Sequence, residues 1–203
     1  SNKSVWKRLL GVERIVIEDW DLEDGDRTLV VSARPAKGAC GRCGRCDRRC
    51  PYYDQGAGRR RWRGMDLGIM KVFIAAPAPR VRCPEHGVVV ASVPWARPNS
   101  WFTRDFEDQT AWLAVHTNRS AVSELMRVAW RTVTHVVEVV GKEARERVDL
   151  LAGLRRIGID EVSYRKGQKY LTVVVDHLSG RLVWMHAGRD AKTERAVGHP
   201  RLR

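Results

Sequence analysis

Two short stretches, Cys43-Gly44-Arg45-Cys46 and Cys83-Pro84-Glu85-His86, decide the fold of the N-terminal part of this 203-residue chain. Each stretch spaces two metal-binding side chains as in a zinc knuckle. A lone Cys-x-x-Cys could be a redox pair, whereas two such pairs at domain distance are typical of a closed tetrahedral zinc site. The sequence therefore predicts a structural zinc ion bound by three thiolates and one imidazole.

The first pair of ligands has a rival interpretation. Cys40 and Cys43 have the same spacing as Cys43 and Cys46, so spacing alone does not choose between Cys40 and Cys46. Cys46 and Cys50 are spaced less well for a shared ion. Both possible first pairs stay open on these residues alone.

The cellular location follows from the cysteine usage and the hydropathy pattern. Four of the five cysteines fall within the eleven residues 40–50, and their total is odd, which does not suit a disulfide scaffold. No stretch is long and apolar enough to span a bilayer, and the N-terminus lacks the apolar region of a signal peptide. We therefore expect a protein of the reducing cytoplasm with no membrane partner.

The interval between the ligand pairs is strongly basic. The chain carries a net charge of +13, and residues 34–104 hold fifteen basic and four acidic side chains, a net charge of +11. This concentration predicts an acidic partner, and double-stranded DNA is the first candidate. Trp62 is predicted to lie in a local core. Four arginines around it, in a predicted loop, are the expected phosphate contacts: Arg59, Arg60, Arg61 and Arg63.

Strands are expected on both sides of this basic interval. Residues 11–34 alternate apolar and polar side chains around the turn signal Asp24-Gly25, which predicts a β-hairpin. Residues 67–75 and 80–83 are predicted strands that lead into the second ligand pair.

Residues 102–147 have the order expected of a helix-turn-helix unit. Thr103 is a predicted N-cap, followed by apolar residues at helical spacing. A short helix is predicted from Ser120 and a longer one from Arg131. An ordinary three-helix packing unit has the same order of elements. Arg131 and Thr132, at the start of the last helix, are predicted to contact DNA.

Residues 155–186 change to an alternation with period two, which predicts an antiparallel meander of three strands. Asp160 lies in the first of these strands, and the alternation sends Asp160 and Glu161 to opposite faces. A carboxylate there is costly to bury unless it binds a metal or a partner, and a partly solvated aspartate is an equal alternative. Asp176 precedes a turn and is expected to be structural.

The ordered series of motifs resembles bacterial insertion-sequence transposases of the ISL-three family over roughly residues 10 to 190. The matching stretches are Cys43-Gly-Arg-Cys46, Tyr53-Asp54, Arg60-Arg61-Trp62-Arg63, Asp66-Leu67-Gly68, Pro79-Arg80-Val81-Arg82-Cys83-Pro84-Glu85-His86-Gly87, Val93-Pro94-Trp95-Ala96, Phe102-Thr103, Ala129-Trp130-Arg131-Thr132-Val133, Gly158-Ile159-Asp160-Glu161 and Lys169-Tyr170-Leu171-Thr172-Val173-Val174-Val175-Asp176.

The resemblance implies a zinc-binding domain and a helix-turn-helix that together bind the terminal inverted repeats of a transposon. It also implies an RNase H-like DDE core that cuts and joins DNA with two Mg²⁺ ions. By position it maps the first catalytic aspartate onto Asp160, and it favours Cys46 over Cys40. The implied zinc ligands are then Cys43, Cys46, Cys83 and His86.

We therefore expect an α+β, multi-domain protein. Residues 1–98 would form a β-hairpin and a zinc-binding domain, residues 99–150 a helix-turn-helix domain, and residues 151–203 the first three antiparallel strands of an incomplete RNase H-like core. Family members continue further and carry the second aspartate and the glutamate. The expectation is thus a truncated DDE transposase that binds transposon ends without cutting, with a homodimer as one candidate assembly. The alternative is a regulator or inhibitor of transposition with no catalysis.

Overall fold

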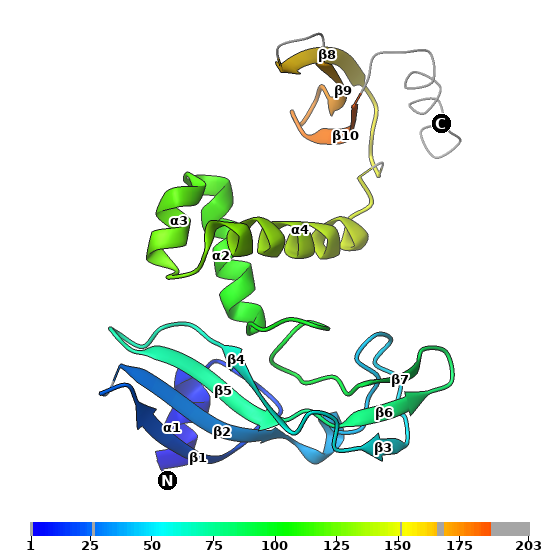
Figure 1. Ribbon diagram of the computed structural model, residues 1–203. Coiled ribbons are helices and arrows are strands. Elements are labelled where there is room, and N and C mark those ends of the chain that lie inside the picture. Colours follow the sequence, from blue (N-terminus) through cyan, green and yellow to red (C-terminus); the bar gives the residue numbers. More distant parts are fainter. Residues whose placement is uncertain (1, 26, 151, 166–168, 188–203) are drawn as a thin grey trace. The chain divides into compact units, whose positions relative to one another are not determined.

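The computed structural model describes residues 2–25, 27–150, 152–165 and 169–187. The chain divides into two compact units, residues 1–140 and 141–203, and each is described by itself. Several sheets and a few helices confirm the α+β class (Figure 1). The finer boundaries near residues 98 and 150 stay predictions. No helix in the described ranges is both long enough and apolar enough to cross a membrane.

A four-stranded sheet forms the centre of the first unit, in the order β1-β2-β5-β4. Its strands are β1 (Ile15–Glu23), β2 (Thr28–Pro35), β5 (Lys71–Pro77) and β4 (Arg59–Arg63). Strands β1 and β2 form the predicted hairpin, and β2 pairs with β5 in parallel. The strand predicted over residues 67–75 begins only at Lys71, because Leu67 and Met70 close a tight turn with two backbone hydrogen bonds of 3.1 Å.

The core of this sheet is built around two tryptophans. Trp62 and Trp95 are each 2% exposed, and their rings meet edge to face with centroids 5.6 Å apart. The predicted core position of Trp62 is therefore confirmed. Helix α1 (Asn2–Leu9), which the sequence analysis does not predict, packs Trp6 against the same core.

The basic segment at residues 59–63 is a strand and not the predicted loop. β4 pairs with β5 from Arg59, opposite Pro77, to Arg63, opposite Phe73. The reason is tertiary: the segment gains a full ladder of hydrogen bonds and buries Trp62, and this outweighs the weak strand preference of arginine.

A second sheet of the first unit carries the cysteine motifs. It has the order β3-β6-β7, with β3 (Tyr52–Asp54), β6 (Arg80–Cys83) and β7 (Gly87–Val90), and one 3-10 turn, η1 (Lys37–Ala39), precedes the first motif. Its small core is almost entirely sulfur and valine: Cys43, Cys50, Val81 and Cys83.

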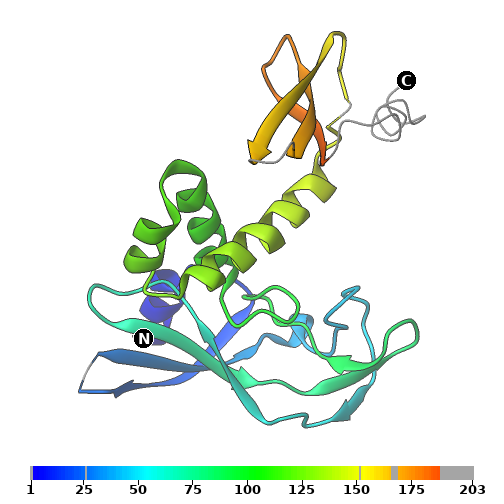
Figure 2. The ribbon, with the colours of Figure 1, turned by 45° about the horizontal axis from the view of Figure 1, so that its top comes forward.

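Three helices complete the first unit, α2 (Arg104–His116), α3 (Arg119–Leu125) and the start of α4 (Trp130–Arg147) (Figure 2). The hydroxyl of Thr103 accepts a hydrogen bond from the Phe106 amide, so Thr103 is the predicted N-cap. Asn118 caps α3, which therefore begins at Arg119, one residue before the predicted start at Ser120. The helices share a core of four buried side chains: Phe106, Val122, Met126 and Val133.

The second unit contains the predicted antiparallel meander. Its strands are β8 (Ile157–Arg165), β9 (Lys169–Asp176) and β10 (Leu182–Ala187), with β9 in the centre. Val174 on β9 and Val183 on β10 are buried, whereas Val173 and Val175 are only partly buried. The second face of β9 is therefore less covered than the run of three valines predicts.

Candidate metal centre and nucleic-acid interface

Four side chains converge at the end of the second sheet. The ligand atoms of Cys43, Cys46, Cys83 and His86 all lie within 4.8 Å of one another. His86 uses Nδ1, which lies 3.7 Å from the sulfur of Cys43 and 3.5 Å from that of Cys83. The sulfurs of Cys46 and Cys83 are 3.8 Å apart.

These separations fit a tetrahedral zinc ion. Zn–S bonds of about 2.3 Å at tetrahedral angles place two sulfurs about 3.8 Å apart, and a sulfur and a nitrogen about 3.6 Å apart. The observed 3.8 Å between Cys46 and Cys83, and 3.5 Å between Cys83 and His86, match these values. The donor set of three sulfurs and one imidazole is also that of a closed structural site.

The backbone brings the first knuckle against the second sheet. The amide of Gly44 donates to the carbonyl of Val90 on β7 at 3.2 Å, and Cys43 forms a β-bridge with Ala91. A Cβ at residue 44 would lie 2.5 Å from the Val90 carbonyl oxygen, so this approach needs glycine. The close approach of Gly44 to β7 thereby places the sulfurs of Cys43 and Cys46 beside the ligand atoms of Cys83 and His86.

The chemistry of Cys83 favours a metal-binding thiolate. Burial raises the pKa of its thiol, but hydrogen bonds from His86 and from the amides of Glu85 and His86 outweigh burial and lower the pKa to about 6. A thiolate is the form that binds zinc. Nε2 of His86 lies 3.8 Å from a carboxylate oxygen of Glu85, which would steady the imidazole from behind.

The two remaining cysteines, Cys40 and Cys50, lie outside the four-residue cluster. Cys40 is exposed, with its sulfur 3.4 Å from the carbonyl oxygens of Pro35 and Ala36, and it does not belong to the cluster. Cys50 is buried beside the cluster and donates to the Arg48 carbonyl at 3.3 Å. The structure thus brings Cys46, and not Cys40, to Cys43.

Two arginines of β4 are exposed, and both have partners within the protein. Arg61 forms two hydrogen bonds of 2.8 Å to the carboxylate of Glu23, and they lower the pKa of that carboxyl. Arg59 donates to the carbonyl of Ala75 at 2.8 Å. Either guanidinium would have to exchange these acceptors for phosphate, and their contact with DNA stays a prediction.

The other two arginines of β4 turn toward the helices. Arg60 donates to the carbonyl of Ser100 at 2.6 Å, and its guanidinium lies 3.9 Å from the ring centroid of the exposed Trp101. Arg63 is only 5% exposed and forms an ion pair with Asp66. The burial of Arg63 places it among the structural side chains, although the sequence analysis expects it to contact DNA.

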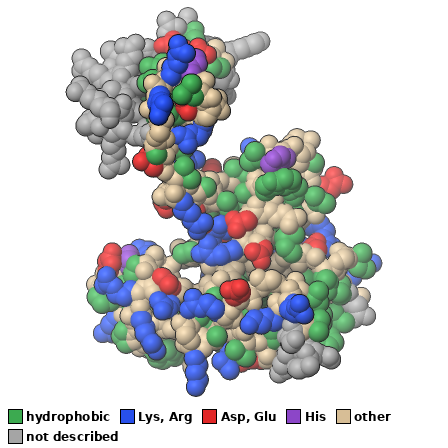
Figure 3. All heavy atoms as spheres, turned by 180° about the vertical axis from the view of Figure 1, so that it is seen from behind, with side chains coloured by type: hydrophobic (Ala, Val, Ile, Leu, Met, Phe, Trp, Pro, Cys, Tyr) green, Lys and Arg blue, Asp and Glu red, His purple; other side chains and the backbone are tan. Residues whose placement is uncertain are grey.

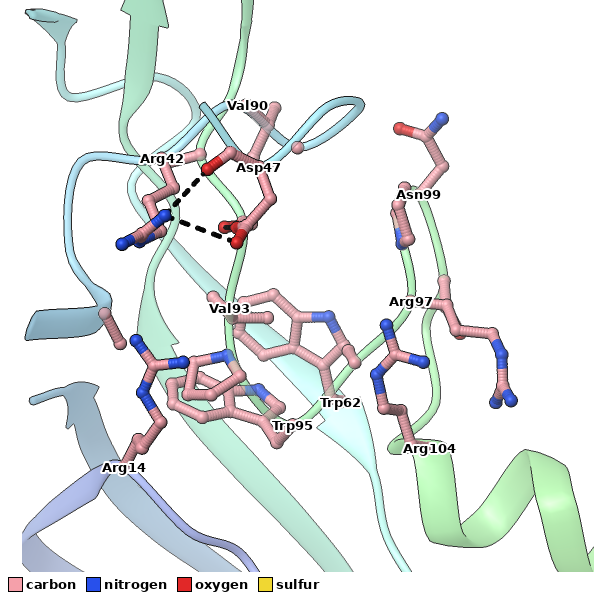
Figure 4. A pocket seen from close by; sticks show the side chains of 18 of the residues that line it. Arg14, Arg42, Asp47, Trp62, Val90, Val93, Trp95, Arg97, Asn99 and Arg104 are labelled. Carbon is pink, nitrogen blue, oxygen red and sulfur yellow. Dashed lines mark hydrogen bonds and ion pairs between the residues drawn. The ribbon is translucent and has the colours of Figure 1, made fainter. Parts of the chain in front are cut away.

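A groove of about 780 Å³ lies beside the first knuckle (Figure 4). Its floor includes Trp62 and Trp95, and Arg42 at its edge is paired with Asp47. Lysine and arginine side chains recur across one face of the first unit, among apolar and acidic ones (Figure 3). Six arginines line the groove, against three acidic residues: Arg14, Arg42, Arg45, Arg60, Arg97 and Arg104.

The start of α4 presents a further polar surface. Arg131 is exposed and its guanidinium lies 5.6 Å from the ring centroid of Trp130, which is itself 55% exposed. Thr132 is partly buried, whereas His135, one turn beyond Arg131, is exposed. Trp130 and His135 are not among the predicted DNA contacts. The spacing of four between Arg131 and His135, which puts these two side chains on one helix face, is the signal that points to His135.

Asp160 lies exposed on β8, opposite Val173 of β9. Its carboxylate accepts a hydrogen bond from the amide of Glu161 at 2.8 Å. Asp176 accepts hydrogen bonds from Ser179 and from the amide of Leu178, which is the expected turn role, and these bonds lower its pKa. Within the described residues, the cysteine and histidine cluster is the one group that could hold a metal ion.

A zinc knuckle pair followed by a helix-turn-helix defines a class of DNA-binding protein, and comparison with known proteins narrows that class. Three family models match in succession: the zinc-finger of transposase IS204/IS1001/IS1096/IS1165 at residues 40–86, the helix-turn-helix domain of transposase family ISL3 at residues 91–138, and a transposase model at residues 157–198. The chain belongs to the ISL3 family of transposases. The helix-turn-helix prediction is therefore confirmed.

Relatives give the same result. The chain is 50% identical over 197 residues to the transposase for insertion sequence element IS1557 from two strains of Mycobacterium tuberculosis, covering 95% of this chain and 44% of the relative. It is 27% identical over 187 residues to the transposase for IS1001 from Bordetella parapertussis, covering 92% and 44%. The chain thus spans less than half the length of these relatives. No solved structure matches it.

Proposed function

We propose that this chain is the DNA-binding part of a transposase that recognises the terminal inverted repeats of an insertion sequence. The observation that carries the proposal is the order of the three matching family models, with an exposed polar surface at the start of α4. In helix-turn-helix proteins this part of the last helix lies in the major groove. Arg131 and Thr132 would contact base edges there, and the exposed β4 arginines, Arg59 and Arg61, would contact phosphate together with the groove.

In the same proposal, Cys43, Cys46, Cys83 and His86 hold a structural zinc ion. The ion would tie residues 43–46 to residues 83–86 and so fix both ends of the basic interval. All four ligand positions would be taken by protein, which leaves no position for a substrate. Its contribution is therefore to folding and to the placement of the arginines.

For catalysis we propose that Asp160 is the first acid of a DDE core. The Mg²⁺ ions of such a core would neutralise charge at the scissile phosphate. Two-metal chemistry needs several carboxylates at one place, and no group of three or more His, Cys, Asp or Glu side chains in the described ranges includes Asp160. We expect this 203-residue polypeptide to bind DNA without nicking it. A regulator that occupies transposon ends is the second candidate, supported by this same observation.

Selection from a library of random duplexes tests the binding proposal. The zinc-loaded chain should enrich a defined sequence, and its affinity for that sequence should fall steeply with salt, because phosphate contacts release counterions. Arg131→Ala should reduce discrimination between the selected and a scrambled duplex by about 10-fold to 100-fold. Failure to enrich any sequence, or binding indifferent to salt, would contradict the proposal.

Nicking of the selected duplex separates the two candidates. The duplex is incubated with the chain and either Mg²⁺ or Mn²⁺, and strand breaks are followed on a denaturing gel. We expect no breaks from this polypeptide. Breaks that disappear in Asp160→Ala would show that the acids needed are supplied, for example by a second copy in a homodimer bound to paired ends.

A cytoplasmic location is part of the proposal, since bacterial DNA lies there.

A further inference from the structure

The turn of the helix-turn-helix contains an arginine in an unusual conformation. Arg127, between α3 and α4, has φ = 52°, in the left-handed region. A Cβ makes this region costly, and glycine adopts it freely. The turn would therefore form more easily with glycine, so the side chain of Arg127 must contribute something that offsets this cost.

The side chain of Arg127 reaches the turn between β4 and β5. Its Nε lies 2.7 Å from a carboxylate oxygen of Asp66, and a second nitrogen contacts the same oxygen. The third nitrogen donates to the carbonyl of Ile69 at 2.9 Å. All three guanidinium nitrogens thus contact a segment some sixty positions earlier in the chain, which connects two neighbouring strands of the sheet.

Asp66 is held from the other side by the sheet. Its second carboxylate oxygen pairs with Arg63 of β4, whose side chain is 6% exposed. One carboxylate therefore joins a buried arginine of the sheet to an arginine of the helix-turn-helix. Met65, the residue before Asp66, packs against the core formed by Phe106, Val122, Met126 and Val133.

We propose that Asp66 is a positioning residue for DNA recognition, and that it acts through Arg127. The contact would hold α4 at a set distance and angle from the sheet that contains the β4 arginines, so that both reach one duplex in a single register. The inference rests on the proposed function, since it assumes that both parts bind DNA. Because Arg127 is partly exposed, the pair should matter less for stability than for this geometry.

Two variants break the contact from opposite sides. Asp66→Asn removes the bridging charge. Arg127→Gly removes the guanidinium and at the same time gives the turn the residue that suits φ = 52°. Glu18→Gln is the matched control, because it makes the same charge change and breaks an ion pair of 3.2 Å with Arg34 on the first sheet. All three should retain zinc and an unfolding transition. Asp66→Asn also leaves the buried Arg63 without its carboxylate and should lower the free energy of unfolding, so Arg127→Gly is the variant that isolates the contact.

The DNA measurement uses duplexes selected from a random library by the unaltered chain. Hydroxyl-radical footprints locate the two protected stretches, and two base pairs are then inserted between them. The unaltered chain and Glu18→Gln should lose affinity about 10-fold or more on insertion, because two rigidly joined modules lose their joint binding when the spacing is wrong. Asp66→Asn and Arg127→Gly should bind the original site about 10-fold more weakly and respond little to the insertion.

A measurement without DNA tests the same contact. Residual dipolar couplings of the amides in β1, β2, β5 and in α2, α3, α4 should fit one alignment tensor in the unaltered chain. In Asp66→Asn and Arg127→Gly the sheet and the helices should need two. One tensor in both variants, or an unchanged response to the insertion, would overturn the inference while DNA binding stands. If the unaltered chain selects no duplex, the proposed function fails, and with it the role in DNA recognition.

Discussion

The zinc knuckles and strand β4 both gather charged or ionisable side chains, but they hold them in different ways. In the knuckles, Cys43, Cys46, Cys83 and His86 point to one centre, so that a single ion can satisfy all of them. On β4, each arginine has its own partner: Ala75 for Arg59, Ser100 for Arg60, Glu23 for Arg61 and Asp66 for Arg63.

This difference indicates which part of the first unit depends most on a single group for its folding stability. Removing the centre of a convergent site leaves every ligand without its partner at once, whereas removing one arginine of a strand leaves the others in place. The partners on β4 also differ in burial, so the four arginines should not be equivalent.

Zinc removal should have the largest effect. Structural zinc sites contribute on the order of 10 kcal/mol to small domains, so a chelator should unfold residues 40–91. Elemental analysis should find about one zinc per chain, and the Cys83→Ser variant should contain no bound zinc. Cys40→Ser is the control, because the Cys40 sulfur does not belong to the cluster, and it should keep the zinc. Loss of zinc in Cys40→Ser together with its retention in Cys46→Ser would show that the rival pair is used.

The zinc-loaded form should become less stable in acid. The pKa of Cys83 is lowered to about 6 in the folded chain. A lowered pKa adds stability that is fully present above the ordinary thiol pKa and is lost as the pH falls through the folded value of about 6, and zinc needs the same thiolate. Urea unfolding of the zinc-loaded protein between pH 9 and pH 5 measures this. Cys83→Ala should flatten the dependence; an equal slope in that variant would assign the effect to other groups.

Removing Arg63 should lower the free energy of unfolding much more than removing Arg61. Arg63→Ala would leave the Asp66 carboxylate short of its buried partner, and breaking a buried pair costs about 3–5 kcal/mol. Arg61→Ala breaks an exposed pair with Glu23, which is worth about 0.2–1 kcal/mol. Chemical denaturation of the two variants compares them directly. Similar losses in both would mean that burial does not distinguish the β4 arginines.

How much of this could be predicted from sequence depends on whether a feature is local. The spacing of Cys83 and His86 is local, because one turn brings both ligands together, and both lie in the cluster that the structure contains. The choice of Cys46 over Cys40 is not local, and it came from the family resemblance and not from the spacing. The partners of Arg63 and Arg61 are set by the register of β4 and by the fold around it. Glu23 lies thirty-eight positions from Arg61, and no pattern in the sequence pairs them.

Two local errors have physical causes as well. Helix α1 was missed because it is only eight residues long and has no acidic residue in its first turn. The sequence predicts a loop at residues 59–63, because Gly56, Gly58 and a run of arginine are turn and surface signals. Its strand form comes from pairing with β5 and from the burial of Trp62, neither of which a short window of sequence contains.

The smallest predicted effect concerns Arg61 on DNA. Its pair with Glu23 is exposed and therefore cheap to exchange, so a phosphate could take the place of the carboxylate. We expect Arg61→Ala to weaken binding to all duplexes alike and to reduce the slope of log affinity against log salt by about 0.9. Glu23→Gln should steepen that slope, because it releases Arg61 in advance. Arg34→Ala removes an equally exposed arginine outside the predicted set and serves as the control. A slope that is unchanged in both Arg61→Ala and Glu23→Gln would mean that Arg61 stays on Glu23 in the complex, and that β4 supports the interface without touching DNA at this position.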